Sequence, residues 1–487
     1  MECYLEGDDE VVLAPASPCS QYMNSSALSI SNIAVLETSI PIKDDDSVIL
    51  SQIRDVFLPI NPRFSSIMVT GKNGEKNWKP VKVILEDHLK VPIFPVGKPL
   101  EFYDYCLSEY LTKISMDPFP QTQPLWEIHI FRYPTSNAGG NYIFKLHQSL
   151  GDGYSLMGAL LSCLQRADNP ALPLTFPRRQ GSGKKQGENS NAVARAFKAV
   201  PRLLSGVVDT VTDFSWNFLK SSLLDDDKTA IHSQDDGVEF RPISVTTMTF
   251  SLYHLKLIKS SLNVTINDVI SGIVTYGTRL YMQENERETC NGECTALVLF
   301  NTRAMGGGYK SVSEMIKPNA EMPWGNRITF LPFAIPKLRS PGDGDSSNPL
   351  RFIYNAHRMV KRQRYSASLY LTGQFLEFTR KLRGLEATAQ FLRRTLKNTS
   401  ITMTNIIGPV EETTLCNHPI KGMYFAVSGA PQNLLVTMLS YAGKLRVTIC
   451  SEKDFIDGKK LKSCIESAFD EIFRLALKSS PPRPPPA

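Results

Sequence analysis

The sequence predicts an α/β protein with two lobes, because strand-like and helix-like segments mix on both sides of a polar, basic linker. The chain has 487 residues, which is enough for two or more domains and a large core. Hydrophobic residues make up 42% and charged residues 21%, a balance typical of globular proteins. We expect the sheets of both lobes to be mixed. The chain is expected to divide into an N-terminal lobe over 13–176, a crossover over 177–240, a C-terminal lobe over 241–477 and a proline-rich tail over 478–487.

Ten segments have the length and composition of β-strands, and they occur in both lobes. They are short runs rich in Val, Ile, Thr, Phe and Tyr. In chain order they are SIMVTG, WEIHIFRY, NYIFKLHQ, SVTTMTFSL, TALVLFNTR, RITFLPFAI, SITMTNI, GMYFAVSG, NLLVTMLSY and KLRVTIC.

Helices are predicted by apolar residues that recur every three or four positions. The last of these helices has a defined start, because Asp457 precedes it and can cap its first turn. The apolar face of that helix consists of Leu461, Ile465, Ala468, Phe469 and Ile472. The predicted helices span 104–114, 153–166, 254–262, 265–283, 351–383, 385–397 and 458–477.

The crossover contains an amphipathic segment over 192–224. Its apolar residues recur at steps of four and three, as a helix stripe does, and Pro201 is expected to kink it. Basic residues lie in its first half and in the linker before it. The segment therefore fits either a helix packed on the protein body or an interfacial helix on an anionic bilayer. Its apolar stripe consists of Val193, Phe197, Val200, Leu204, Val207, Val211, Phe214 and Phe218.

Composition excludes several classes of protein. The net charge of +6 is too mild to suggest a nucleic-acid partner. The acidic N-terminus does not resemble a signal peptide, and no apolar run approaches the ~18 residues of a spanning helix. Nine scattered cysteines suggest reduced thiols in a protein that faces the cytosol. Cys290 and Cys294 favour a loop with two thiols over a zinc site, so no metal is expected.

The stretch FKLHQSLGDGYSLM, residues 144–157, predicts a strand, a turn and a helix. Gly151 and Gly153 permit a tight turn around Asp152, which can then cap the helix. His147 at the strand end can act as a general base, because a neutral imidazole accepts a proton near physiological pH. On spacing alone, a hydrogen-bonded strand histidine and a capping aspartate are at least as good an interpretation, so both stay open.

Further stretches occur in the same order as in a known family. They are SPCSQYMNSSALS, QPLWEIHIF, FKLHQSLGDGYSLMGALL, FNTR, PWGNRITFLPF and TMTNIIGPVEE. In these stretches the chain resembles the plant bifunctional wax ester synthase/diacylglycerol acyltransferases of the HHxxxDG condensation superfamily. The resemblance covers roughly residues 13–477.

The resemblance implies a chloramphenicol-acetyltransferase-like fold with a solvent tunnel between two lobes and the motif at its middle. Acyl-CoA would enter from one side and a long-chain alcohol or diacylglycerol from the other. The base would deprotonate the hydroxyl, which attacks the thioester and releases coenzyme A. The resemblance implies no cofactor apart from acyl-CoA as co-substrate, and a place at the cytosolic face of the endoplasmic reticulum membrane or at the plasma membrane.

The family pattern HHxxxDG is incomplete in this chain. His147 matches the first histidine, and Gln148 occupies the position of the second, which is the usual base. A glutamine amide donates and accepts hydrogen bonds but is not a proton acceptor at any useful pH. His147 should point to the opposite face of the strand unless a bulge turns it.

Three interpretations follow from this departure. His147 acts as the base after a local shift. Alternatively, Gln148 positions the hydroxyl while another group, or the leaving coenzyme A thiolate, takes the proton. In the third interpretation the protein binds acyl ligands without turnover. Because acid–base catalysis contributes about 10²–10⁴-fold, an enzyme without the base would be slow.

The resemblance also assigns residues around the turn. The catalytic set is His147, Gln148, Asp152 and Gly153. Asp152 is expected to face away from the substrate and to hold the turn through Arg303, although a surface arginine at a strand end is an equal alternative. The residues expected to line or shape the substrate tunnel are Gly151, Asn301, Arg303, Trp324, Gly325, Asn326, Asn405, Gly408 and Pro409.

The leading hypothesis is therefore an O-acyltransferase that makes wax esters or triacylglycerol from acyl-CoA at a membrane surface. A catalytically impaired acyl-CoA or lipid-binding homologue is the second hypothesis. The third is a soluble acyltransferase that acts on a small alcohol or amine.

Overall fold

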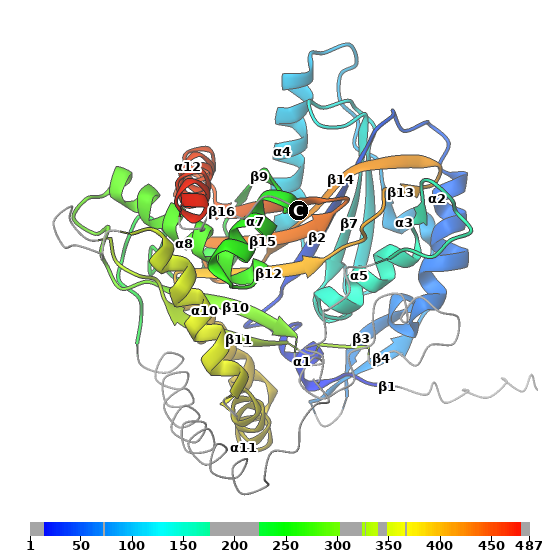
Figure 1. The fold of residues 1–487 in the computed structure, drawn as a ribbon. Helices are drawn as coiled ribbons and strands as arrows, with labels where there is room; N and C mark the ends of the chain where they lie inside the picture. Colours follow the sequence, from blue (N-terminus) through cyan, green and yellow to red (C-terminus); the bar gives the residue numbers. More distant parts are fainter. Residues whose placement is uncertain are drawn as a thin grey trace, which may run out of the picture.

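The computed structural model describes residues 14–71, 74–175, 224–301, 324–326, 328–338, 348–365 and 368–478. Two large mixed sheets form the centres of two lobes, with helices around them (Figure 1). This arrangement confirms the predicted α/β fold class. Residues 192–223 of the amphipathic segment, Arg303 and the tail after residue 478 lie outside the described residues.

The first large sheet has seven strands in the order β5-β6-β7-β2-β14-β13-β8. At its centre β7 pairs antiparallel with β2, and His147 lies opposite Ser31. All eight residues of β7 are buried, as expected of a strand that is covered on both faces. The strands span Ser31–Thr38 (β2), Leu89–Lys90 (β5), Trp126–Phe131 (β6), Gly140–His147 (β7), Gln165–Arg166 (β8), Thr413–Leu415 (β13) and His418–Ser428 (β14).

Strand β14 comes from the C-terminal half of the chain but lies in this first sheet. It pairs antiparallel with β2 from Ile420 to Ser428 and packs between β2 and β13. The predicted C-terminal lobe over 241–477 therefore needs one correction, because residues 413–428 complete the N-terminal sheet. A strand-like composition predicts a strand but not its partner, which long-range packing decides.

The second large sheet has six strands in the order β11-β10-β12-β15-β16-β9. Strands β10, β12 and β15 are parallel to one another, and the remaining pairs are antiparallel. The sheet is therefore mixed, as predicted. The strands span Ile243–Ser251 (β9), Thr295–Asn301 (β10), Ile328–Ala334 (β11), Ile401–Ile407 (β12), Leu434–Tyr441 (β15) and Lys444–Glu452 (β16).

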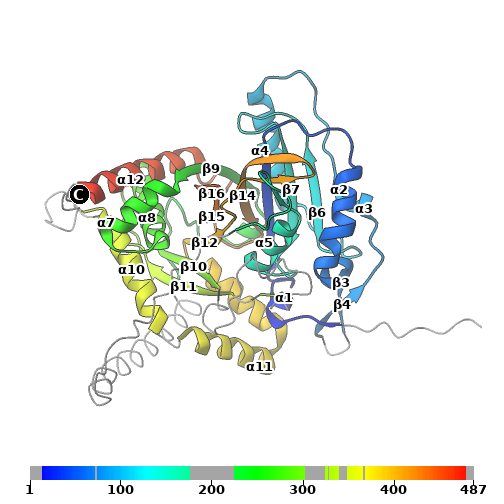
Figure 2. The ribbon, with the colours of Figure 1, turned by 45° about the vertical axis from the view of Figure 1, so that its right-hand side comes forward.

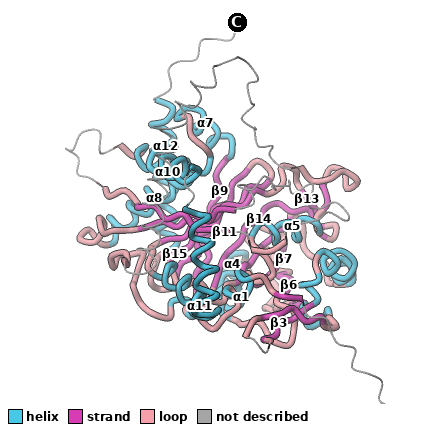
Figure 3. Tube along the Cα trace, turned by 90° about the horizontal axis from the view of Figure 1, so that it is seen from below, coloured by secondary structure: helices cyan, strands magenta, loops and turns pink. Residues whose placement is uncertain are grey.

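Four helices gather on one side of the second sheet, where α8 packs against both α10 and α12 (Figure 3). They span Leu252–Leu262 (α7), Ile266–Asn285 (α8), Leu350–Tyr365 (α10) and Gly458–Lys478 (α12). The predicted cap of α12 is confirmed, because Asp457 Oδ1 accepts hydrogen bonds from the backbone N–H groups of Lys459 and Lys460. The buried face of α12 includes Leu461, Ile465, Ala468 and Ile472.

Helix α11 (Ser368–Lys397) runs beneath the two lobes (Figure 2). It is kinked at Gly384, whose φ of 83° lies in the region that favours glycine. The kink confirms the predicted helix boundary near residue 384. Arg380 forms a 2.7 Å ion pair with Glu75, so α11 contacts the N-terminal half of the chain.

The N-terminal lobe carries shorter elements around its sheet. A small sheet has the order β1-β4-β3, with strands at Ala14–Pro15, Lys76–Pro80 and Ser66–Thr70. The helices are α1 (Pro18–Tyr22), α2 (Ser47–Gln52), α3 (Leu85–His88), α4 (Leu100–Met116) and α5 (Gly153–Ser162). The helical turns are η1 (Ile53–Phe57), η2 (Leu58–Ile60), η3 (Pro62–Ser65) and, after the crossover, η4 (Val238–Phe240).

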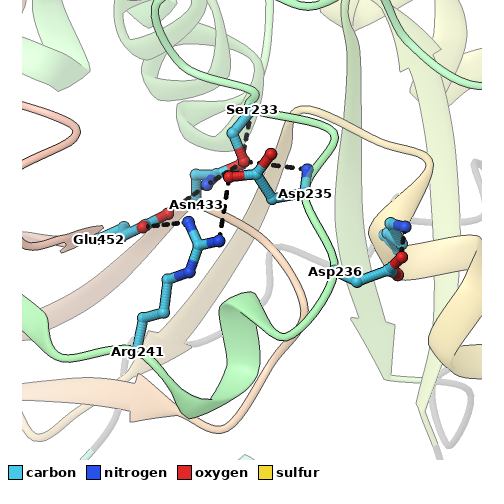
Figure 4. A network of polar contacts seen from close by, with 7 residues as sticks. Ser233, Asp235, Asp236, Arg241, Asn433 and Glu452 are labelled. Atoms are coloured by element: carbon cyan, nitrogen blue, oxygen red, sulfur yellow. Dashed lines mark hydrogen bonds and ion pairs between the residues drawn. The ribbon is translucent and has the colours of Figure 1, made fainter.

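The chain that leaves the crossover is fixed to the second sheet by a polar network (Figure 4). Asn433 accepts a 3.0 Å hydrogen bond from the backbone N–H of Ser233 and donates to Ser233 Oγ and to Glu452. Arg241 donates to Glu452 at 2.7 Å and to Asp235 at 3.0 Å. Because Asn433 and Glu452 are buried, these contacts satisfy groups that would otherwise be costly to bury.

Eight cysteines within the described residues are free thiols. Cys290 and Cys294 lie in a loop around Arg279, whose buried guanidinium donates to Cys290 O and Gly292 O at 2.9 Å. In the described part of the chain no three His, Cys, Asp or Glu side chains come together as metal ligands would. None of the helices in that part is both long enough and apolar enough to span a bilayer.

Candidate active site

The motif turn connects β7 to α5, and Asp152 caps the helix as predicted. Its backbone is extended, and Asp152 Oδ1 accepts a 3.0 Å hydrogen bond from the backbone N–H of Ser155. The carboxylate is buried and satisfies a donor at the helix start. This local role follows from sequence signals alone and does not require a substrate.

The two glycines of the turn are required for close packing. A Cβ at position 151 would lie 2.8 Å from Ser155 Cβ, and a Cβ at position 153 would lie 2.8 Å from Ile406 Cδ1. Neither Gly151 nor Gly153 has a positive φ. The sequence prediction of a glycine-dependent tight turn is therefore corrected, because the glycines admit neighbouring side chains rather than unusual backbone angles.

His147 and Lys145 lie on the same face of β7, as strand alternation predicts. The His147 ring is buried against Phe119, with the ring centroids 5.9 Å apart. Lys145 Nζ lies 4.4 Å from the centre of the same phenyl ring. The sole histidine of the motif is thus enclosed between the strand and the segment that follows α4.

Both ring nitrogens of His147 are occupied. Nδ1 lies 2.7 Å from Ser149 Oγ and accepts a 3.2 Å hydrogen bond from the backbone N–H of Ser149. Because that N–H can only donate, Nδ1 carries the lone pair and the ring proton is on Nε2. Nε2 lies 3.1 Å from Ser29 Oγ and donates to it. The single lone pair of the ring is therefore directed at Ser149.

The electrostatic surroundings of His147 also oppose a base. Burial lowers the pKa of His147 to about 3, and the charges of Lys76 and Lys145 contribute to the lowering. A ring with this pKa stays neutral at physiological pH and holds a transferred proton weakly. The observed geometry suits a histidine that fixes the end of β7.

Gln148 points away from His147 and is held on both sides of its amide. Gln148 Oε1 accepts a 2.6 Å hydrogen bond from Asn32 of β2, and Gln148 Nε2 donates a 3.0 Å hydrogen bond to Asn326 Oδ1. Asn326 Nδ2 donates in return to the backbone carbonyl of Gln148 at 2.8 Å. The residue at the usual base position is therefore an oriented amide.

The predicted residues Trp324 and Gly325 lie directly against the motif turn. Trp324 Nε1 donates a 2.7 Å hydrogen bond to Leu150 O, and Ser155 Oγ donates to Gly325 O at 3.2 Å. Arg63 Nη1 donates to the same Leu150 carbonyl at 3.0 Å. The segment 324–326 thus brings the C-terminal half of the chain onto the turn that carries Gln148.

Asn405, Gly408 and Pro409 lie at and just beyond the end of β12, near the start of α5. Asn405 Nδ2 donates a 2.7 Å hydrogen bond to Asn267 Oδ1. Gly408 N donates to Ser440 O at 3.0 Å, and a Cβ at position 408 would lie 2.4 Å from that oxygen. Gly408 and Pro409 therefore shape the strand end, while Asn405 presents an amide there.

Two predicted residues do not join the observed set. Arg303 lies outside the described residues, so its contact with Asp152 stays a prediction. Asn301 ends β10 opposite Ile328, and its side chain is not among those described.

Residues that no sequence pattern had indicated hold the motif from neighbouring elements. Asn32 and Ser29 belong to or precede β2, a strand that was not predicted. Arg63 belongs to η3, and Ser149 lies within the motif stretch, where its contact with His147 was not predicted. The short apolar run Ile33–Leu36 between polar residues was the available signal for β2.

A pocket of about 520 Å³ lies away from this site, at the last turns of α11. Its cations Arg393 and Lys397 are paired with Glu239 and Asp236. The described residues that line this pocket do not include any residue of the motif turn.

Two lobes with the motif turn at their junction define a chloramphenicol-acetyltransferase-like fold. Among solved structures, the wax ester synthase/diacylglycerol acyltransferase from Marinobacter aquaeolei VT8 matches with a TM-score of 0.58 and 14% identity, covering 95% of this chain and 99% of that chain. The first condensation domain of the calcium-dependent antibiotic synthetase matches with a TM-score of 0.55 and 14% identity, covering 97% and 98%. These likenesses show the fold.

Sequence comparisons define the family. Residues 104–270 match the wax ester synthase/diacylglycerol acyltransferase catalytic domain, and residues 324–473 match the WS/DGAT C-terminal domain. Wax ester synthase/diacylglycerol acyltransferase 11 of Arabidopsis thaliana is 27% identical over 455 residues, covering 91% of this chain and 90% of that protein. Wax ester synthase/diacylglycerol acyltransferase 4 of the same plant is 29% identical over 469 residues, covering 92% and 87%. The chain belongs to the wax ester synthase/diacylglycerol acyltransferase family.

Proposed function

We propose that this protein transfers a fatty acyl group from acyl-CoA to the hydroxyl of a long-chain alcohol or a diacylglycerol. The products are a wax ester or a triacylglycerol. Family membership and the acyltransferase fold support this reaction. The observation that carries the proposal is the motif turn itself, where Gln148 is oriented by groups from both halves of the chain.

In this reaction the alcohol oxygen bonds to the thioester carbonyl carbon, and the carbon–sulfur bond breaks. The hydroxyl proton ends on the coenzyme A sulfur, so the products are one ester and one free thiol. We assign the proton to the departing thiolate because Gln148 is not a base and His147 is neutral, buried and fully hydrogen-bonded. The reaction needs no metal and no bound cofactor in this scheme.

Gln148 acts in this scheme as a hydrogen-bonding group. Its amide uses one N–H on Asn326 and one lone pair on Asn32. A glutamine amide has a second N–H and a second lone pair, which stay available for substrate. We assign the N–H to the thioester oxygen, where negative charge develops, and the lone pair to the attacking hydroxyl.

The second candidate is an acyl-CoA or lipid-binding protein without turnover. The same observation favours it, because neither motif residue offers a base. The two candidates differ in one measurable property, which is ester formation by the unmodified chain.

The test is an ester-forming assay with labelled acyl-CoA and either a fatty alcohol or a diacylglycerol. A short alcohol and an amine are assayed as separate acceptors, to test the hypothesis of a soluble acyltransferase that acts on a small alcohol or amine. We expect slow ester formation by the wild type, a faster rate for Gln148→His and a slower one for Gln148→Ala. Because a general base contributes about 10²–10⁴-fold to the rate, we expect a large difference between the rates of Gln148→His and the wild type.

The variant His147→Gln is the matched control for the motif histidine. It retains hydrogen-bonding groups at position 147, so we expect it to keep most of the wild-type rate. Loss of ester formation in folded His147→Gln would favour His147 as the base. If the wild type forms no ester while Gln148→His does, the lipid-binding candidate is correct.

We also propose that the protein works at the cytosolic face of the endoplasmic reticulum membrane. The lipid character of the proposed acceptors and the basic, amphipathic sequence of 192–224 support this location. The double substitution of Phe214 and Phe218 by serine should increase the share of the protein in the soluble fraction of cell lysates. An unchanged distribution would count against this segment as the membrane contact.

A further inference from the structure

A nine-residue loop between β5 and α4, VPIFPVGKP at residues 91–99, carries exposed apolar side chains. In Figure 1 this loop stands at the top of the molecule, beyond the N-terminal end of α4. The side chains of Ile93 and Val96 are 90% and 83% exposed, more than any other large hydrophobic residue described as exposed. Leu100, the first residue of α4, adds a partly exposed aliphatic group directly after the loop.

Two tyrosines hold the backbone of this loop in place. The Tyr133 hydroxyl accepts a 2.7 Å hydrogen bond from Phe94 N and donates one of 2.8 Å to Phe94 O. The Tyr103 hydroxyl accepts from Lys98 N at 3.1 Å and donates to Pro95 O at 2.8 Å. The rings of these two tyrosines stack with centroids 5.0 Å apart.

The phenyl ring between the exposed residues faces inward. Phe94 packs against Phe131, Tyr133 and Tyr110, with centroid separations of 5.5, 5.5 and 6.4 Å. Because Phe94 is anchored, its neighbour Ile93 is directed outward. Proline at positions 92, 95 and 99 further restricts the backbone. The fold therefore holds Ile93 and Val96 in water, instead of leaving them to collapse onto the surface.

The small size and protruding shape of the loop tip formed by Ile93 and Val96 indicate what kind of partner it can bind. A stable protein–protein interface buries about 800 Å² on each side over a complementary surface. Two aliphatic side chains on a protruding loop are far too few for such an interface. A fluid hydrocarbon layer has no fixed shape and can enclose a small convex tip completely. We propose that the loop 91–99 inserts Ile93 and Val96 into the surface of a lipid bilayer.

The charges around the tip indicate which bilayers it fits. Lys90 and Lys98 are exposed, and so are Glu86 and Glu101. Because the signs are mixed, the loop has no strong preference for an anionic surface. Insertion should therefore occur on zwitterionic bilayers and should depend little on salt. The basic segment 192–224, in contrast, would favour anionic lipids and low salt.

The test places a fluorescent reporter at the tip. The full-length variant Ile93→Trp is mixed with phosphatidylcholine vesicles, with and without lipids that carry a quencher in the acyl chain. We expect a blue-shifted emission and quenching by the acyl-chain quencher, unchanged when the salt concentration is raised. The control Tyr253→Trp places the reporter at a residue that is 66% exposed on α7, and should show neither effect. Emission of Trp at position 93 that stays that of a water-exposed indole would overturn the proposal.

Vesicle co-sedimentation gives an independent measurement. The double variant Ile93→Ser, Val96→Ser should bind phosphatidylcholine vesicles at least about tenfold more weakly than the wild type. The matched control Phe240→Ser, Tyr253→Ser removes two exposed rings elsewhere and should bind as the wild type does. Equal binding by the wild type and the loop variant would also overturn the proposal. Since no acyl-CoA is present, the result does not depend on the proposed reaction.

Discussion

Gln148 and Asn326 hold each other through two hydrogen bonds. Gln148 Nε2 donates to Asn326 Oδ1 at 3.0 Å, and Asn326 Nδ2 donates to the backbone carbonyl of Gln148 at 2.8 Å. Asn32 completes the arrangement at 2.6 Å from Gln148 Oε1. The Gln148 amide, which occupies the position of the usual base, therefore has a defined orientation. Its contribution to the reaction rate can be measured by removing the groups that orient it.

Replacing Asn326 by alanine should release the Gln148 amide. We expect kcat to fall by about tenfold, because a mispositioned hydrogen-bonding group no longer favours the reactive geometry. Steady-state ester formation with acyl-CoA and a fatty alcohol measures this. The control Ser20→Ala removes the longer 3.3 Å contact of the same asparagine and should have a smaller effect. Equal rates for Asn326→Ala and the wild type would contradict a positioning role.

The buried His147 should make the stability of the protein depend on pH. Its pKa of about 3 in the folded state lies below the ordinary value of 6.5, so the unfolded chain binds a proton that the folded chain refuses. This contribution to stability is complete above pH 6.5 and is lost progressively as the pH falls toward 3. Between pH 7 and pH 5 the loss from this group is roughly 2 kcal/mol.

The variant His147→Gln isolates this contribution. Urea unfolding of wild type and variant at pH 7 and pH 5 gives the difference in unfolding free energy at each pH. We expect the difference to shift by roughly 2 kcal/mol in favour of the variant at pH 5. A difference that is the same at both pH values would show that His147 has the same pKa in the folded and unfolded chain, which would contradict the lowered pKa.

Gly408 and Gly153 should respond differently to an added methyl group. A Cβ at position 408 would meet the backbone oxygen of Ser440 at 2.4 Å, whereas one at position 153 would meet the end of the Ile406 side chain. A backbone oxygen in a strand cannot move aside as a side-chain end can. We expect Gly408→Ala to lower the unfolding free energy by about 1–3 kcal/mol and Gly153→Ala by less. Thermal unfolding measures both losses, and a larger loss of stability for Gly153→Ala than for Gly408→Ala would argue against the described packing.

The network in Figure 4 should contribute to stability through its buried members. Asn433→Ala removes the acceptor of Ser233 N–H and one partner of Glu452, which leaves buried polar groups unsatisfied. We expect a loss of about 1–3 kcal/mol in urea unfolding. The half-exposed partner Asp235 provides the comparison, and Asp235→Asn should change stability little because solvent replaces its contact.

Local signals predicted the parts of the site that depend on neighbours in sequence. The strand ending at His147, the helix after Gly153 and the Asp152 cap all follow from patterns within fifteen residues. The opposite directions of His147 and Gln148 follow from strand alternation. These features need no knowledge of the rest of the fold.

The remaining features depend on contacts between distant residues. The low pKa of His147 arises from burial and from Lys76 and Lys145, and no local pattern indicates how Lys76 approaches it. Asn32 reaches Gln148 because β2 lies beside β7, although more than a hundred residues separate them. The family resemblance predicted that 324–326 line or shape the substrate tunnel, but only the fold shows that they lie against the motif turn and which atoms they contact.

The position of β14 has a consequence for how the protein is made. The ribosome completes β2 and β7 long before it reaches residues 418–428, and until then one edge of β2 has no partner strand. An unpaired, apolar strand edge favours association with other chains. During synthesis the N-terminal sheet therefore stays incomplete until most of the chain has emerged from the ribosome. We expect the nascent chain to depend most on chaperones during this interval.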